Sequence, residues 1–250
     1  MILEAIQYAA TTLVTPREFR PFIRSSLGLW GRARRCANAW AAHEQNCHAF
    51  VRETIEPMRQ RRTTVVLGSG LLRDVPIGEL SKAFDTVVLV DLVHLASVQT
   101  WLKLKRFDNV RLISRDLSGL SDALCGHTPE PLSFLRQVPY LDLVISANIV
   151  SQIGVGCRRQ LERSGHADSD MIVPQLIRAH LEGLAYLPCK AALLTDVSYQ
   201  VTDRSGSVIE ADDLLCGVSG PVAKRSWDWP VAPFGELGRD RQAVHRVIAA

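Results

Sequence analysis

From residue 63 onward, short and almost wholly apolar segments alternate with longer stretches in which apolar residues recur at helical spacing. The apolar segments are rich in Val, Ile and Leu, and they cover residues 63–68, 85–91, 109–114, 141–147 and 190–199. Strands that are apolar throughout are typical of a parallel sheet with helices on both faces. The alternation therefore predicts an α/β, doubly wound fold with a mostly parallel sheet.

The end of the chain has a different pattern. Two further strand-like segments, residues 222–237 and 242–250, are separated only by the four residues 238–241. A parallel return needs a dozen residues or more, so this short connection predicts a C-terminal antiparallel hairpin. Residues 154–169 are polar and contain glycines, and we expect them to form an exposed loop after the fourth strand.

The first 60 residues read as helical, with early breaks at Pro16 and Pro21. Five residues recur at spacings of three, four or seven, which places them on one helical face: Trp40, Cys47, Val51, Ile55 and Met58. We expect this face to pack on the rest of the protein.

The composition and charge of the chain argue against several classes of protein. The chain of 250 residues is 47% hydrophobic and 22% charged, and it has no apolar run of the ~20 residues that a membrane span needs. Its start lacks a secretory leader, so we expect a cytoplasmic protein. The net charge of +3 and the scarcity of aromatic residues among the early arginines disfavour nucleic-acid binding. Six widely spaced cysteines predict neither a metal site nor a disulfide framework.

A glycine turn, Gly68-Ser69-Gly70, follows the first predicted strand and precedes a helix. Glycines allow a sharp turn and the close approach of a ligand to the backbone. The N-terminus of the next helix carries free N–H donors and partial positive charge. The turn therefore predicts a site for a polar or anionic end of a ligand.

Polar residues follow the next three strands of the predicted sheet. Asp91 ends the second strand about 20 residues after Gly70, where a carboxylate can accept both hydroxyls of a ribose. Asp116 follows the third strand, and Asn148 follows the fourth. A helix N-cap at Asp91 and a turn or a cap at Asp116 are the structural alternatives. Because parallel strands end at one edge of a sheet, these side chains are expected to share one crevice.

With these residues assembled, the chain resembles the class I S-adenosylmethionine-dependent methyltransferases over roughly residues 60–250. The resemblance rests on the segments VVLGSG, VVLVD, RDL and LDLVISANIVSQI and on the terminal hairpin. It implies a seven-stranded sheet and an N-terminal helical lid, and hence a division into a cap (residues 1–60) and a Rossmann-like domain (residues 61–250).

The resemblance also implies S-adenosyl-L-methionine as cofactor, with no metal, and a small molecule or a protein side chain as methyl acceptor. Its cofactor-binding residues would surround the methionine part, the ribose, the adenine and the transferable methyl group in turn. In this sequence they are Gly68, Ser69 and Gly70, then Asp91 and Leu92, then Asp116 and Leu117, and finally Asn148.

Two positions depart from the family pattern. The family often has an acidic residue two positions before the first glycine, where this chain has Val66, and a third glycine where it has Leu72. Arg73 or Asp74 are alternative sources of polar contacts to the cofactor's amino group.

Direct methyl transfer needs alignment of the reacting atoms, and a general base only when the acceptor is protonated. His94, His166 and Tyr199 lie near the expected crevice, but a lone histidine is more often structural, so the pattern singles out no catalytic residue.

Two other functions fit parts of the pattern. An NAD(P)-dependent oxidoreductase also uses a glycine turn followed by a strand-end acid, but the third small residue of that fingerprint falls on Arg73. A non-enzymatic binding or scaffold protein could retain the same fold.

Overall fold

The computed structural model describes residues 2–166 and 168–250, and its centre is one eight-stranded sheet. The strands are β1 (Thr63–Leu67), β2 (Thr86–Asp91), β3 (Val110–Ser114), β4 (Leu141–Ala147), β5 (Lys190–Asp203), β6 (Val208–Asp213), β7 (Arg225–Ala232) and β8 (Arg241–Ala249). Seven of them follow the order β3-β2-β1-β4-β5-β8-β7. The first five are parallel, whereas β8 runs antiparallel to both β5 and β7. The predicted fold class and the C-terminal hairpin are confirmed.

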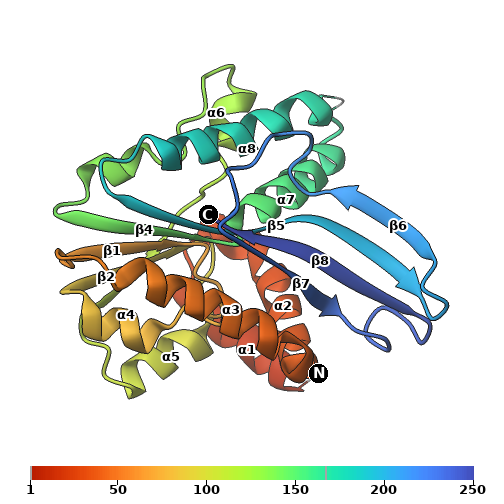
Figure 1. The fold of residues 1–250 in the computed structure, drawn as a ribbon, viewed down its shortest axis with the longest axis horizontal. Coiled ribbons are helices and arrows are strands. Elements are labelled where there is room, and N and C mark those ends of the chain that lie inside the picture. The colour runs from red at the N-terminus through yellow and green to blue at the C-terminus, as the bar shows by residue number, and fades with distance from the viewer. Residues whose placement is uncertain (1, 167) are drawn as a thin grey trace.

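The eighth strand, β6, pairs with β5 beside this seven-stranded path. All six of its residues are exposed, so no apolar pattern marks it in the sequence. It lies in the part of the sheet that extends away from the helices in Figure 1.

Helices cover both faces of the sheet, with α1 to α5 below and α6 to α8 above in Figure 1. They are α1 (Ile2–Val14), η1 (Arg17–Phe22), α2 (Ile23–Arg35), α3 (Ala37–Ile55), α4 (Ile77–Ala83), α5 (Ala96–Leu104), α6 (Leu120–Leu124), η2 (Ser133–Gln137), α7 (Ile149–Arg163) and α8 (Ser169–Ala185). Successive strand residues point to opposite faces. In β1, Val66 belongs to the core with Phe50 of α3, and Val65 belongs to the core with Ile153 and Leu176.

The N-terminal segment is helical, as predicted, and Pro21 lies inside the short helix η1 between α1 and α2. Four of the five predicted residues are buried on α3, namely Trp40, Cys47, Val51 and Ile55. Met58 is partly buried against the core that contains Cys47, Val51 and Ile55, whereas Trp40 belongs to a second core with Trp229 and Val231. The Trp40 indole donates a hydrogen bond to the Val231 carbonyl of β7. The predicted apolar face therefore packs on the sheet.

The expectation of an exposed loop over residues 154–169 is wrong for most of that range. Residues 154–163 belong to α7, whose apolar side chains recur every fourth residue and face the core: Ile149, Ile153, Cys157 and Leu161. The polar residues Gln152, Arg159 and Gln160 are on the exposed side, whereas Ser151 is buried. Helical spacing outweighs average polarity here, because one buried stripe is enough to hold a helix on a sheet.

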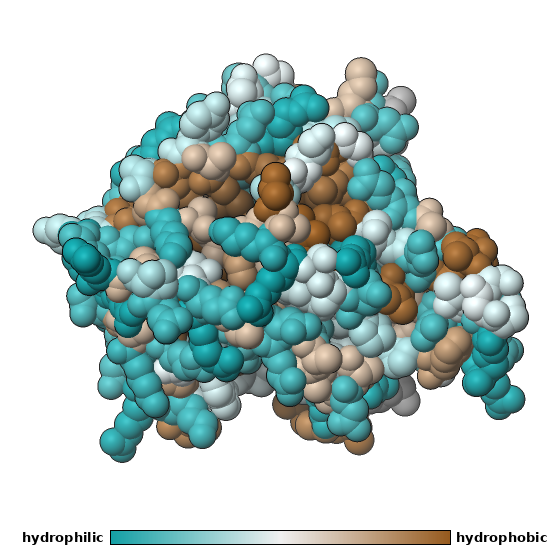
Figure 2. All heavy atoms as spheres, in the orientation of Figure 1, coloured by the Kyte–Doolittle hydropathy of each residue, from teal (hydrophilic) through white to brown (hydrophobic). Residues whose placement is uncertain are grey.

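The surface is polar over most of the face shown in Figure 2, where the largest group of apolar side chains forms a band beneath the upper helices and smaller groups lie elsewhere on the face. Among the described residues, no helix has the length and apolar character needed to cross a membrane.

Candidate functional site

A cavity of about 320 Å³ opens beside the carboxyl ends of the parallel strands. Four of the predicted site residues line it: Asp91, Leu92, Asp116 and Leu117. The wall also includes Phe22, Ser25 and Ser26 from η1 and α2, and residues of α7, β5 and β8. The cavity therefore joins the ends of β2 and β3 to the N-terminal helices and the C-terminal hairpin.

Asp91 is held at the end of β2 by two backbone donors. The Gly70 N–H donates to Oδ2 at 2.7 Å, and the Leu92 N–H donates to Oδ1 at 2.7 Å. Burial raises the pKa of Asp91 above its usual value, although these two hydrogen bonds favour the ionised form. The alternative N-cap role is wrong, since α5 begins at Ala96 and has no side-chain cap.

Asp116 and Leu117 occupy the turn after β3. Asp116 is exposed, and its Oδ1 accepts a hydrogen bond of 2.8 Å from the Ser118 N–H, so the predicted turn role is present. Leu117 is buried with Val65 and Leu67. Both residues also line the cavity, so the turn role and a ligand contact are compatible.

The glycine turn approaches Asp91 but does not line the cavity, as judged from the residues that the structure describes. Gly68 has φ +73°, and a Cβ built there would lie 2.7 Å from the Ala147 carbonyl oxygen. Gly70 has φ +47°, and a Cβ there would meet only the Gly68 carbonyl oxygen, at 3.8 Å. Gly68 is therefore required by packing against β4, whereas the space beside Gly70 is open.

Leu72 occupies the position of the family's third glycine and adopts φ +59°, in the left-handed region. Its N–H closes a turn by donating to the Ser69 carbonyl at 2.9 Å. The backbone thus keeps the conformation that favours glycine, at the cost of strain in a leucine. Val66, the other departure, is fully buried in the apolar core, where it makes no polar contact.

Asn148 lies at the N-cap of α7 with φ +53° and is buried. Its Nδ2 donates a hydrogen bond of 2.8 Å to Oδ2 of Asp74, which the sequence suggests as a substitute polar group. Among the described residues, its Oδ1 has no hydrogen-bond partner, and Asn148 is not part of the cavity wall. The side chain therefore joins the end of β4 to the loop after the glycine turn.

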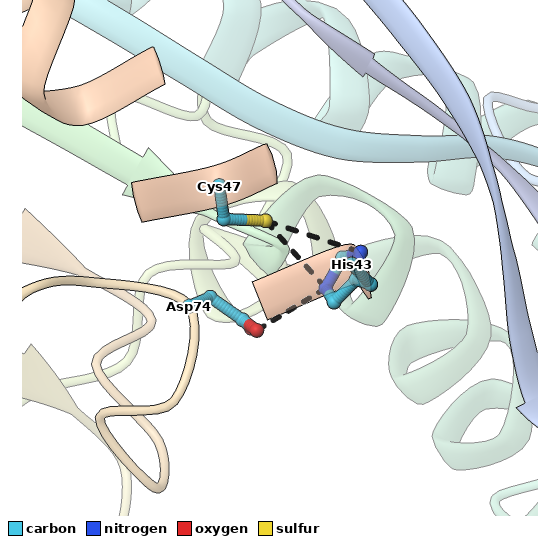
Figure 3. Close-up of side chains that lie close together, drawn as sticks. All are labelled: His43, Cys47 and Asp74. Atoms are coloured by element: carbon cyan, nitrogen blue, oxygen red, sulfur yellow. Dashed lines mark hydrogen bonds and ion pairs between the residues drawn. The ribbon is translucent and has the colours of Figure 1, made fainter. Parts of the chain in front are cut away.

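A cluster next to this loop contains the buried His43 and Cys47 and the half-buried Asp74 (Figure 3). His43 Nε2 lies 3.2 Å from Asp74 Oδ1 and 3.6 Å from Cys47 Sγ. The Trp227 indole donates to His43 Nδ1 at 3.0 Å, so Nε2 carries the proton of the neutral ring. Burial acts to raise the pKa of Asp74, but the hydrogen bonds from His43 and Asn148 lower it overall.

Three ligand atoms so close together also suggest a metal site. A metal on Nε2 would require that nitrogen to lose its proton while Nδ1 still accepts from Trp227, which would leave an imidazolate. The Trp227 hydrogen bond therefore favours a chain of hydrogen bonds that joins α3, β7 and the Asp74 loop.

The three base candidates near the expected crevice do not line the cavity, within the described part of the chain. His94 is buried and bonds through Nε2 to the Ile113 carbonyl at 3.0 Å. His166 is exposed after α7. The Tyr199 hydroxyl donates to Glu210, which raises the pKa of Tyr199 to about 12. None of the three is placed to exchange a proton with a molecule in the cavity.

Sequence reasoning missed Ser151, Asp196 and His245, which all line the cavity. Asp196 accepts hydrogen bonds from the Ser151 hydroxyl and from His245 Nδ1. The sequence does mark Asp196, because this acidic residue interrupts the apolar run of the fifth strand. No local pattern marks His245, since its partner lies 49 residues away in the chain.

No family model and no curated protein matches the chain. Similar solved structures include a SAM dependent methyltransferase from Aquifex aeolicus, with 12% identity, TM-score 0.33 and coverage of 75% of this chain and 82% of that one. N-methyltransferase NodS from Bradyrhizobium japonicum WM9, in complex with S-adenosyl-L-homocysteine, has 8% identity, TM-score 0.37 and coverage of 82% and 86%. The glycopeptide N-methyltransferase MtfA, complexed with S-adenosyl-L-methionine, has 12% identity, TM-score 0.30 and coverage of 81% and 93%. Such low identities and TM-scores do not assign this chain to a family.

Proposed function

We propose that the protein is an S-adenosylmethionine-dependent methyltransferase that acts on a small molecule or a protein side chain. One observation carries the proposal. Asp91 and Asp116, the polar residues at the ends of β2 and β3, line a single cavity. Asp91 also accepts a hydrogen bond from the backbone of the glycine turn. In doubly wound sheets, ligands bind in the crevice outside the carboxyl ends of the strands, so this is where a nucleoside is expected.

Two features next to the cavity support the binding of the cofactor, although neither the glycine turn nor Asn148 is part of the cavity wall that the described residues form. Ser69 Oγ and Asn148 Oδ1 are buried and lack hydrogen-bond partners among the described residues. Buried polar atoms are rarely left without a partner, so these two atoms are suited to bind a polar ligand. The open space beside Gly70 gives a ligand access to the backbone.

In this proposal Asp91, with Leu92 beside it, accepts the ribose hydroxyls. Asp116 and Leu117 flank the adenine, with Leu117 as the apolar surface. Gly68, Ser69 and Gly70 hold the methionine part, and Asn148 lies near the methyl group. When bound, S-adenosylmethionine would supply an electrophilic methyl group. The protein's task is to align an acceptor with that group and to exclude water.

The N-terminal helices contribute to the same cavity through Phe22, Ser25 and Ser26. We therefore propose that residues 1–60 act as a cap on the acceptor side and that residues 61–250 form the cofactor-binding domain. Nucleic acid is not the acceptor in this proposal, because the net charge is only +3. The expected cytoplasmic location belongs to the same proposal.

Calorimetry with S-adenosylhomocysteine tests the proposal. Saturable binding of one molecule per chain is the expected result, and no binding at high micromolar ligand would contradict it. A fluorescence titration with reduced nicotinamide cofactor separates the oxidoreductase alternative, which predicts saturable binding there instead. Cofactor binding without labelling of any acceptor by a methyl-labelled donor in cell extract would favour the scaffold alternative.

A further inference from the structure

The cavity contains a second group of polar side chains, Ser151, Asp196 and His245, which come from α7, β5 and β8. Asp196 is buried, and each of its carboxylate oxygens has its own donor. The Ser151 hydroxyl donates to Oδ1, and His245 Nδ1 donates to Oδ2 at 2.5 Å. A buried carboxylate with two such donors holds both of them in place.

The hydrogen bond to Asp196 determines which ring nitrogen of His245 is free to accept a proton. A carboxylate only accepts hydrogen bonds, so Nδ1 carries the proton of the neutral ring and the lone pair lies on Nε2. Within the described chain, no hydrogen bond to Nε2 is present, and His245 lines the cavity. The ring is also oriented by Trp229, at a centroid distance of 5.8 Å, and by Tyr199, at 5.6 Å. His245, a residue of the cavity wall, therefore keeps Nε2 as its free proton acceptor.

We propose that His245 Nε2 accepts a proton from the methyl acceptor, with Asp196 and Ser151 as positioning residues. The inference rests on the proposed methyltransferase function and limits the chemical class of the methyl acceptor. The acceptor is then an alcohol, a phenol or an amine, whose attacking atom carries a proton. Thiolates and carboxylates are excluded as acceptors, because they attack without losing a proton.

The proposed step transfers one methyl group and one proton. The acceptor's oxygen or nitrogen uses its lone pair to form a bond to the methyl carbon, and the carbon–sulfur bond breaks with its electron pair going to sulfur. The proton of the attacking atom passes to Nε2. The positive charge lost from the sulfonium thus appears on the imidazolium, beside the Asp196 carboxylate, and the proton then leaves to water.

Chemical modification tests the position of His245 without any acceptor. Diethyl pyrocarbonate reacts with the unprotonated nitrogen of accessible histidines, and peptide mass spectrometry reports each site. We expect S-adenosylhomocysteine to slow the modification of His245 several-fold and to leave the exposed His127 and His166 unchanged. Equal reactivity of His245 with and without the ligand would overturn the inference.

The acceptor class is tested with a methyl-labelled donor and a panel of alcohols, phenols, amines, thiols and carboxylic acids. We expect labelling of hydroxyl or amine compounds, with a rate about 100-fold lower in His245→Gln and in Asp196→Asn. His127→Gln makes the same change at an exposed histidine and should keep the wild-type rate.

The binding of S-adenosylhomocysteine to each variant is measured by calorimetry, so that a folding defect is recognised by lost binding. Asp196→Asn keeps the shape of the side chain and therefore provides the second test. Labelling of thiols or acids alone, no labelled alcohol or amine, or an unchanged rate in both variants would overturn the inference. Failure of the wild-type protein to bind S-adenosylhomocysteine would instead contradict the proposed function itself.

Discussion

The backbone N–H of Gly70 donates a hydrogen bond of 2.7 Å to the carboxylate of Asp91, 21 residues later in the chain. This contact joins the two parts of the sequence that carry most of the resemblance to methyltransferases. It also means that Asp91 has a structural role in the turn as well as the proposed contact with ribose.

Asp91→Ala should weaken the binding of S-adenosylhomocysteine by about 1 to 3 kcal/mol, because the substitution removes the proposed partner of the ribose and frees the Gly70 turn. Calorimetry measures the change. Asp108→Ala removes an exposed carboxylate in the loop before β3 and is the matched control, with no expected effect. Equal affinities of the wild type and Asp91→Ala would remove Asp91 from the site.

Gly68→Ala and Gly70→Ala should differ in their effect on stability. Both place a Cβ on a left-handed backbone, which costs about 1 to 2 kcal/mol. Only at Gly68 does the new methyl group meet a backbone carbonyl at 2.7 Å, so a further cost of about 1 to 3 kcal/mol is expected there. Urea unfolding measures both variants, and equal losses would contradict the packing described at β4.

Leu72→Gly should be more stable than Leu72→Ala by about 1 kcal/mol, the reverse of the usual order for these two residues. Both variants lose the leucine side chain, so their difference isolates the cost of φ +59°. Denaturant unfolding of the pair provides the measurement. A more stable alanine variant would show that the turn changes conformation without the leucine.

Because His180 is buried, the folded protein is expected to lose stability in mild acid. Burial lowers the pKa of His180 to about 4, whereas the unfolded chain has the ordinary value near 6.5. The unfolded state therefore takes up the proton first as the pH falls. The contribution of His180 is fully present above pH ~6.5 and is lost progressively down to pH ~4, by about 2 to 3 kcal/mol.

The test compares the wild type with His180→Gln, which cannot be protonated there and retains a group that can bond to Ser146 Oγ, the partner of His180 Nε2 at 3.0 Å. Unfolding free energies at a series of pH values should fall more steeply for the wild type between pH ~6.5 and ~4. Parallel slopes for the two proteins would show that His180 does not titrate in this way.

Much of the fold could be predicted from local pattern. Apolar runs identified the parallel strands most clearly at β1 and β4, because a strand covered on both faces has no polar side to display, whereas the edge strand β3 alternates between half-buried and exposed residues. The short connection between the last two strands, residues 233–240 in the structure, required an antiparallel hairpin. Strand β6 could not be found in this way, since all its residues are exposed, and α7 was obscured by the polar residues between its buried ones.

The candidate site was likewise only partly predictable from local pattern. Residues at strand ends could be assigned to one edge, and Asp91, Asp116 and Leu117 do share a cavity. The conformations of Leu72 and Asn148, both left-handed, depend on packing that no short segment reveals. Asn148 is also turned toward Asp74 by a hydrogen bond across 74 residues.

The sequence by itself determined the positions of the five parallel strands, the direction of the last hairpin and the positions of glycine and acid at strand ends, because these follow from periodicity and chain connection over a few residues. Only the tertiary structure decided that Asp196 binds His245 and Ser151, that Trp227 sets the protonated nitrogen of His43, and that η1 and α2 close one wall of the cavity. Those contacts join residues 45 to 184 positions apart or depend on how helices pack on the sheet, and local pattern contains no information about either.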